Sequence, residues 1–202
     1  MARKKAVGKK SPFVSKWIKR MWIAFFSGLI LFILFMFGVS KGWFGYMPDI
    51  VELENPKTKL ATEIFTSDGE VLGQFYHLEN RTNVAYSDLP VFLVNSLVAT
   101  EDVRFYKHSG IDAEALVRAI IFMGKKGGGS TLTQQLAKNL FHETPKSKLG
   151  RILQKFKEWI IAVQLEKRYT KKEIIMMYLN TVDFGNSYGI KSAANKYFNK
   201  EV

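Results

Sequence analysis

The chain has 202 residues, of which 47% are hydrophobic and 14% aromatic, and it contains no cysteine. This composition suits one compact domain with an appendage, and the lack of cysteine excludes disulfides, thiolate metal sites and a cysteine nucleophile. The formal net charge is +12, but no nucleic-acid-binding motif accompanies it. We therefore expect no nucleic-acid partner.

The charge is distributed unevenly along the chain. Residues 1–20 contain eight Lys or Arg and no acidic residue. Residues 49–114 contain five basic and twelve acidic residues, whereas residues 125–172 contain twelve basic and three acidic ones. The first basic block precedes an apolar segment, and the second is suited to an anionic ligand.

Residues 21–40 carry no charge, and as a helix they are long enough to cross a hydrocarbon layer of roughly 30 Å. Trp17, Trp22, Trp43 and Tyr46 lie near the two ends, as aromatic rings do at membrane interfaces. The alternative is a cleaved signal peptide, but this segment is longer than such peptides, and no small-residue cleavage site follows it. The basic arm, residues 1–20, is expected to be cytoplasmic and the rest extracytoplasmic.

The segment after the anchor, residues 41–87, is expected to be a connector with a small β-hairpin. Strand-like runs at 61–66 and 71–76 flank the turn signal Ser67-Asp68-Gly69. From residue 88 the apolar residues follow helical periods, with Pro90 near a helix start. Further helices are expected at 112–123, 131–141, 149–167, 171–179 and 191–198, so the domain at 88–202 should be mainly α.

Glu101 and Asp102 stand at the end of an apolar helix, beside Val98, Val103 and Phe105. A carboxylate in such a place is expected to be partly desolvated, which raises its pKa toward that of a useful base. The alternative is an ordinary solvated pair of acidic residues at a helix end.

Three consecutive glycines, 127–129, precede Ser130 and Thr131. Either residue can cap the helix that follows, and Gln134 occupies the capping-box position if Thr131 is the cap. Lys138 lies on the same face, so the loop and the helix N-terminus suit a pyrophosphate or a polar sugar. The alternative is a hinge before a well-capped helix; the spacing is not that of a Walker loop.

Arg151, Lys155 and Glu158 share one face of the predicted helix at 149–167. The apolar residues of this helix are expected to form its buried side: Ile152, Phe156, Trp159, Ile160 and Val163. The alternative is a solvent-facing ladder of salt bridges. Histidines are too widely spaced to predict a metal site, and no Gly-x-Ser-x-Gly elbow is present.

Together these motifs resemble those of the family 51 peptidoglycan glycosyltransferases, both in their order and in their residues, over residues 60–202. The residues that carry the resemblance are 99–110, 128–139, 155–158, 178–180 and 188–198. The resemblance implies a mainly α fold: a transmembrane helix, a hairpin connector and a lysozyme-like helical domain. It also implies that the domain continues beyond residue 202. The chain is then the N-terminal part of a class A penicillin-binding protein, with a transpeptidase domain after it, or a monofunctional relative.

By this resemblance the protein polymerises lipid II into β-1,4-linked glycan strands, with inversion and release of undecaprenyl pyrophosphate. Glu101 corresponds to the general base, Lys155 to the residue that stabilises the pyrophosphate, and Glu158 to a second catalytic glutamate. Other matched positions are expected to bind substrate: Asp102, Phe105, His108, Ser130, Thr131, Gln134, Gln135, Lys138 and Asn139. Gln154 stands where the family usually has arginine, so that phosphate contact is expected either to be missing or to be made by Arg151.

No cofactor is required by these residues, although the resemblance allows a divalent cation such as Mg²⁺ near Glu158. The expected partners are lipid II, the growing glycan strand, inner-membrane lipid, and proteins of cell-wall elongation or division. The expected location is the bacterial inner membrane, crossed once. Two alternatives are a lysozyme-like enzyme that cleaves glycan and a non-catalytic scaffold. The basic stripe beside a lipid anchor argues against the first, and the presence of both Glu101 and Glu158 against the second.

Overall fold

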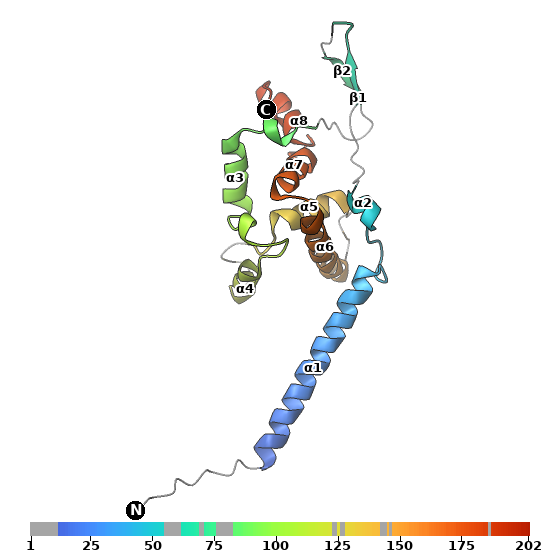
Figure 1. Cartoon of the computed structure of the whole chain (residues 1–202), viewed down its shortest axis with the longest axis vertical. Helices are drawn as coiled ribbons and strands as arrows, with labels where there is room; N and C mark the ends of the chain where they lie inside the picture. The colour runs from blue at the N-terminus through green and yellow to red at the C-terminus, as the bar shows by residue number, and fades with distance from the viewer. Residues whose placement is uncertain are drawn as a thin grey trace, which may run out of the picture. The chain divides into compact units, whose positions relative to one another are not determined.

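The computed structural model describes residues 12–54, 62–68, 71–75, 83–122, 125, 128–141, 145, 147–185 and 187–202. Within these ranges the chain is mainly helical, as predicted (Figure 1). It divides into two compact units, with the boundary in the sequence between Gly45 and Tyr46. The predicted boundary at residue 88 falls inside the second unit and stays a prediction.

The first unit is built around α1, which spans Pro12–Ser40. The helix therefore begins before the predicted start at residue 21, and proline at the first helical position breaks no helical hydrogen bond. Its segment Lys16–Ser40 is long and apolar enough to cross a membrane. Aromatic side chains contact one another along it, as in the stacked pair Trp22 and Phe26.

The end of α1 is fixed by a Schellman motif. Gly42, at φ +75°, donates its N–H to the carbonyl of Val39 at 3.0 Å, and Trp43 donates to the carbonyl of Gly38 at 3.1 Å. Because the left-handed conformation favours glycine, the sequence Lys41-Gly42 stops the helix at this point.

The predicted hairpin is present. Strands β1 (Thr62–Phe65) and β2 (Val71–Phe75) pair antiparallel, with Thr62 opposite Phe75 and an irregularity after Ile64. The predicted strand ends at 61 and 76 and the turn residue at 69 lie outside the described residues.

The second unit contains seven α-helices among its described residues: α2 (Ile50–Glu54), α3 (Val91–Glu101), α4 (Ala113–Ile121), α5 (Leu132–Phe141), α6 (Lys148–Arg168), α7 (Lys171–Thr181) and α8 (Ile190–Phe198). Two short 3₁₀ helices, η1 (Tyr86–Asp88) and η2 (Phe105–Lys107), flank α3. The predicted helices from α3 to α8 are all confirmed, with ends that differ by about two residues or fewer. The sequence analysis did not predict α2 or the 3₁₀ helices, which are too short to show a period.

Local capping explains where several helices begin. Asp112, Ser147 and Thr170 precede α4, α6 and α7, and their side chains accept hydrogen bonds from first-turn N–H groups. Thr170 and Glu173 form a complete capping box. Such a cap typically stabilises a helix by about 1 kcal/mol.

The core of the second unit surrounds α5, which packs against α6 and α7 (Figure 1). Leu132 and Leu136 of α5, Ile161 and Leu165 of α6, and Ile174 of α7 are all fully buried. Burying each such side chain contributes about 1.5–3 kcal/mol. The loop that precedes α5 is therefore attached to a helix that is buried in the core.

The prediction for the buried side of α6 is wrong. Ile152 is 55% exposed and the other predicted residues are half-buried, whereas Gln154, Lys157 and Glu158 are buried beside Ile161 and Leu165. The polar side chains face inward because each has a partner there, so their burial is not penalised as it is for unpaired groups.

Residues 46–54, here called the strap, lie against α6. The Lys157 ammonium donates to the carbonyl of Tyr46 at 2.9 Å, and the Tyr169 hydroxyl donates to the carbonyl of Leu53 at 2.8 Å. Leu53 is fully buried in the core. The strap is therefore part of the second unit. The burial of Lys157 in this contact also lowers the pKa of its ammonium group, through desolvation.

An amide clamp fixes α7 to the segment before α3. Asn180 accepts from the N–H of Val84 and donates to its carbonyl, both at 2.9 Å. Gly189, at φ +82°, packs so closely that a Cβ there would lie 2.9 Å from the Asn180 carbonyl oxygen. This clamp fixes the C-terminal end of α7, the helix that also carries Tyr178.

Candidate active site

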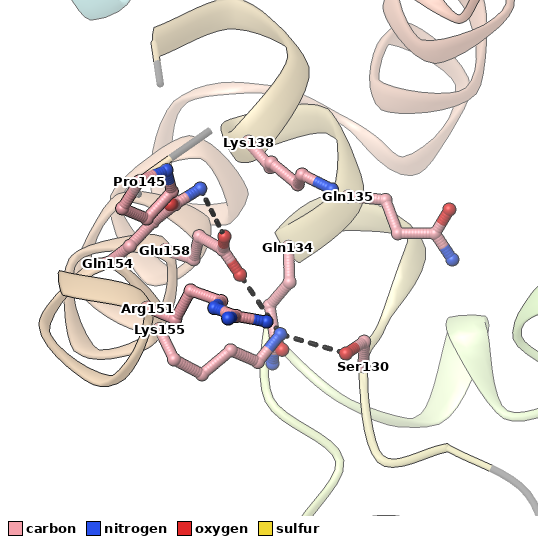
Figure 2. A pocket seen from close by; sticks show the side chains of 9 residues that line it. All are labelled: Ser130, Gln134, Gln135, Lys138, Pro145, Arg151, Gln154, Lys155 and Glu158. Carbon is pink, nitrogen blue, oxygen red and sulfur yellow. Dashed lines mark hydrogen bonds and ion pairs between the residues drawn. The ribbon is translucent and has the colours of Figure 1, made fainter. Parts of the chain in front are cut away.

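Three neighbouring pockets follow one another across the second unit. The basic pocket, of about 460 Å³, is lined by Ser130, Gln134, Gln135, Lys138, Pro145, Arg151, Gln154, Lys155 and Glu158 (Figure 2). The central pocket, of about 180 Å³, shares Ser130 with it and also contains Glu101. The apolar pocket, of about 310 Å³, shares Glu101 with the central one and is lined by Leu93, Leu97, Tyr178, Leu179, Val182, Phe184 and Ile190, among others. Glu101 and Lys155 thus belong to one series of adjoining hollows.

In the basic pocket, Lys155 is held between two oxygen atoms. Its ammonium donates to the Ser130 hydroxyl at 2.8 Å and to Glu158 Oε2 at 3.0 Å (Figure 2). Gln154 Nε2 donates to the other Glu158 oxygen at 3.1 Å. Glu158 is only 5% exposed, so this buried carboxylate fixes a half-exposed cation at the pocket wall. Arg151 lines the same pocket, and its predicted phosphate contact stays a prediction.

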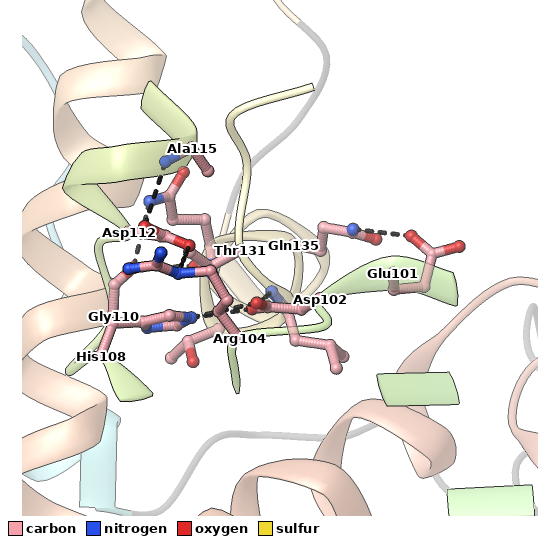
Figure 3. A network of polar contacts seen from close by, with 12 residues as sticks. Glu101, Asp102, Arg104, His108, Gly110, Asp112, Ala115, Thr131 and Gln135 are labelled. Carbon is pink, nitrogen blue, oxygen red and sulfur yellow. Dashed lines mark hydrogen bonds and ion pairs between the residues drawn. The ribbon is translucent and has the colours of Figure 1, made fainter. Parts of the chain in front are cut away.

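Glu101, the last residue of α3, is exposed. The expected partial desolvation of this carboxylate is therefore wrong: Val103 beside it is 71% exposed, and the chain turns after α3 so that Asp102 and Phe105 point inward instead. Glu101 Oε2 accepts a hydrogen bond from Gln135 Nε2 at 2.9 Å (Figure 3).

Asp102 is 8% exposed and occupies the N-terminus of α5. Its carboxylate accepts from the N–H of Leu132 at 2.9 Å, and both oxygens lie 3.1 Å from His108 Nε2 (Figure 3). The helix N-terminus that was expected to attract a substrate anion therefore already holds an anion of the chain itself.

Thr131 and Gln134 are each 1% exposed and converge on Gly110. The Gly110 carbonyl accepts from the Thr131 hydroxyl at 2.7 Å and from Gln134 Nε2 at 3.0 Å. Of the two predicted caps, Thr131 accepts from the N–H of Gln134 at 3.2 Å. The Gln134 amide bonds to Gly110 and not to the cap residue, so the reciprocal half of the capping box is replaced by a tertiary contact.

The remaining predicted residues lie in different surroundings. Phe105 is fully buried, with the Lys171 ammonium 4.1 Å from its ring centroid. Lys171 also donates to the carbonyl of His108 and to Glu166, both at 2.8 Å, which fixes the segment that carries His108. Lys138 is exposed in the lining of the basic pocket, and Asn139 is exposed outside the three linings.

Tyr178 was not predicted as a site residue. Its hydroxyl donates to Gln135 Oε1 at 3.0 Å, a contact between residues 43 positions apart. Burial raises the pKa of Tyr178, and the charge of Glu101 raises it further. The signal that could have found it is a phenol in the otherwise apolar run Ile174 to Leu179, because a buried hydroxyl needs a partner.

The transglycosylase family model matches residues 68–202 of this chain. Penicillin-binding protein 1F of Bacillus subtilis is 44% identical over 147 residues, which cover 70% of the chain and 20% of that protein. Penicillin-binding protein 1A of Vibrio cholerae is 34% identical over 93% of the chain, and that of Aquifex aeolicus 37% identical over 89%. The chain spans 23% and 24% of these two relatives, so it corresponds to about a quarter of their length.

Proposed function

Because the chain belongs to the transglycosylase family, we propose that it is the peptidoglycan glycosyltransferase portion of a class A penicillin-binding protein. The observation that carries this proposal is the common series of pockets that contains an exposed carboxylate, Glu101, and a cationic group, Lys155 with Arg151. A sugar transfer that expels a pyrophosphate needs both: a base for the attacking hydroxyl and cations for the leaving group.

In the proposed reaction Glu101 takes the proton of the 4-hydroxyl of the acceptor GlcNAc. The hydroxyl oxygen then bonds to C1 of the donor MurNAc. The bond from C1 to the pyrophosphate oxygen breaks, and its electron pair leaves with undecaprenyl pyrophosphate. Attack opposite to the leaving group inverts C1 and gives a β-1,4 link. The exposure of Glu101 allows this direct contact with an acceptor.

The departing pyrophosphate is proposed to bind in the basic pocket, at Lys155 and Arg151. Glu158 sets the position of the Lys155 ammonium, and Ser130, Gln135 and Lys138 offer further polar contacts. The buried residues of the predicted binding set are proposed to support the 128–131 loop and the end of α3: Asp102, Phe105, His108, Thr131 and Gln134.

The divalent cation expected near Glu158 stays a prediction. Among the described residues, no group of three or more His, Asp or Glu side chains could hold a metal. Both Glu158 oxygens already accept hydrogen bonds, so a cation there depends on phosphate and water oxygens for most of its ligands. No step of the proposed reaction runs through it.

We further propose that residues 21–40, the apolar part of α1, span the bacterial inner membrane with residues 1–20 in the cytoplasm. This part lies within the segment Lys16–Ser40 that is long and apolar enough to cross a membrane, and the basic arm precedes it. A polyprenyl-linked substrate stays in the bilayer, so a tethered enzyme meets it there. The growing strand and the cell-wall elongation or division proteins remain proposed partners, and a following transpeptidase domain stays a prediction.

The test is polymerisation of fluorescent lipid II by the full-length protein in detergent, with products resolved on a gel. Polymer is expected from the wild type and from the control Glu201→Gln, which removes an exposed carboxylate outside the pockets. None is expected from Glu101→Gln or in the presence of moenomycin. A folded Glu101→Gln protein that still polymerises contradicts the role of Glu101; an inactive wild type supports the scaffold, and release of muropeptides from sacculi supports the cleaving enzyme.

A further inference from the structure

We propose that Tyr178 is a positioning residue that orients the Gln135 amide and, through it, the Glu101 carboxylate; this inference rests on the proposed function. The Tyr178 hydroxyl donates to Gln135 Oε1 at 3.0 Å, and Gln135 Nε2 donates to Glu101 Oε2 at 2.9 Å. The three side chains come from α7, α5 and α3, so the relay joins three separate helices.

The groups at the two ends of the relay, the Glu101 carboxylate and the Tyr178 hydroxyl, determine which atom donates in each hydrogen bond. An ionised Glu101 carboxylate can only accept, so the amide must present Nε2 to it. The amide oxygen then faces Tyr178 and needs a donor, which the hydroxyl provides. In a flipped amide, Oε1 would face the carboxylate, and two acceptors would repel each other. The Tyr178 hydroxyl therefore stabilises the one amide orientation that holds Glu101.

The relay connects an exposed side chain, Glu101, to a buried one, Tyr178. Glu101 is exposed at the last position of α3, where an unrestrained carboxylate samples several rotamers. Tyr178 is 6% exposed, between the buried Ile174, Ile175 and Leu179 on α7. Burial raises the pKa of Tyr178, so the hydroxyl keeps its proton at neutral pH and remains a donor.

The proposed consequence is kinetic. A base that is held in place lowers the barrier of the chemical step, whereas it changes substrate affinity little. Removing the Tyr178 hydroxyl should therefore lower kcat and leave KM nearly unchanged. If Tyr178 acted by contacting the substrate in the apolar pocket, which it also lines, KM would rise instead.

The first test is a double-mutant cycle with lipid II in the full-length protein. Tyr178→Phe keeps the ring and should lower kcat by about 10-fold to 100-fold, part of what general base catalysis contributes. In a Gln135→Ala background the same substitution should have no further effect, because the relay is already broken. Additive losses, or a loss confined to KM, overturn the inference.

The matched control is Tyr169→Phe, which removes a hydroxyl that donates to the Leu53 carbonyl, away from the pockets. This change should lower stability to a similar extent and leave kcat unaltered. A loss of kcat as large as that of Tyr178→Phe would show that destabilisation alone explains the effect, and it would contradict the relay.

A second test does not depend on catalysis. In protein with isotope-labelled glutamine, the NMR signals of the Gln135 side-chain NH₂ should shift in Tyr178→Phe and in Glu101→Gln, and stay in place in Tyr169→Phe. If the Gln135 NH₂ signals keep their positions in Tyr178→Phe, the inference is overturned even if the protein polymerises lipid II. If the NH₂ signals shift in Tyr178→Phe but the folded wild type does not polymerise lipid II, the relay stands and only the proposed function is contradicted.

Discussion

Replacing Asp102 by alanine tests whether this residue holds the site together. The substitution leaves two buried donors, the N–H of Leu132 and Nε2 of His108, without their acceptor. Each unpaired buried group costs about 1–3 kcal/mol, so the two together cost about 2–6 kcal/mol. For a unit of this size, about 2–4 °C accompanies each kcal/mol, so the midpoint of thermal unfolding should fall on the order of 10 °C.

The assay is tryptophan fluorescence during heating in detergent, together with lipid II kinetics. Asp102→Asn serves as the matched variant, because its amide oxygen can still accept from the N–H of Leu132 and the loss should be smaller. An unchanged midpoint for Asp102→Ala, combined with a raised KM, would refute this reasoning and assign Asp102 to the substrate.

Three further predictions concern Gly110, Lys157 and Lys155. Gly110→Ala forces a side chain into φ +88° with its Cβ 2.8 Å from the backbone carbon of Ala162, so unfolding free energy should fall by at least about 2 kcal/mol in denaturant titration; an unchanged titration midpoint contradicts this. Desolvation lowers the pKa of Lys157 from its ordinary 10.5, so the folded chain binds that proton less tightly than the unfolded chain does. The wild type should therefore gain thermal stability relative to Lys157→Met as the pH rises toward 10.5, and a constant difference argues against it. Lys155→Ala should lower kcat for lipid II about 10²-fold to 10³-fold, because other enzymes lose that much when one group that stabilises developing charge is removed. The control is Lys167→Ala, which removes an exposed lysine.

The helices could be predicted because their signals are local. Asp112, Ser147 and Thr170 cap helices within three residues of themselves, and the apolar periods between caps are regular. The buried face of α6 could not be predicted, because polar and apolar stripes on this helix are both long. Which stripe turns inward depends on partners from other segments, such as the carbonyl of Tyr46, 111 positions away from Lys157.

The candidate site was predicted in part for the same reason. Lys155 and Glu158 are one helical turn apart, so their contact follows from spacing. Glu101 and Asp102 were predicted together, but their opposite burial depends on how the chain turns after α3. The apolar run around Tyr178 indicates that its hydroxyl needs a partner, but it does not identify Gln135, because that contact arises only when α5 and α7 pack together.

The carboxylate of Asp102 at the start of α5 also bears on turnover. A helix N-terminus offers rigid backbone donors that would hold a phosphate in place after the reaction as firmly as during it. Here the N–H of Leu132 is taken by Asp102 and that of Gln134 by Thr131. A pyrophosphate in the basic pocket would therefore meet side-chain cations, Lys155 and Arg151, and Lys155 has partners of its own in Ser130 and Glu158. In the proposed reaction, the Lys155 ammonium can return to Ser130 and Glu158 when the pyrophosphate leaves, which favours product departure over tight retention.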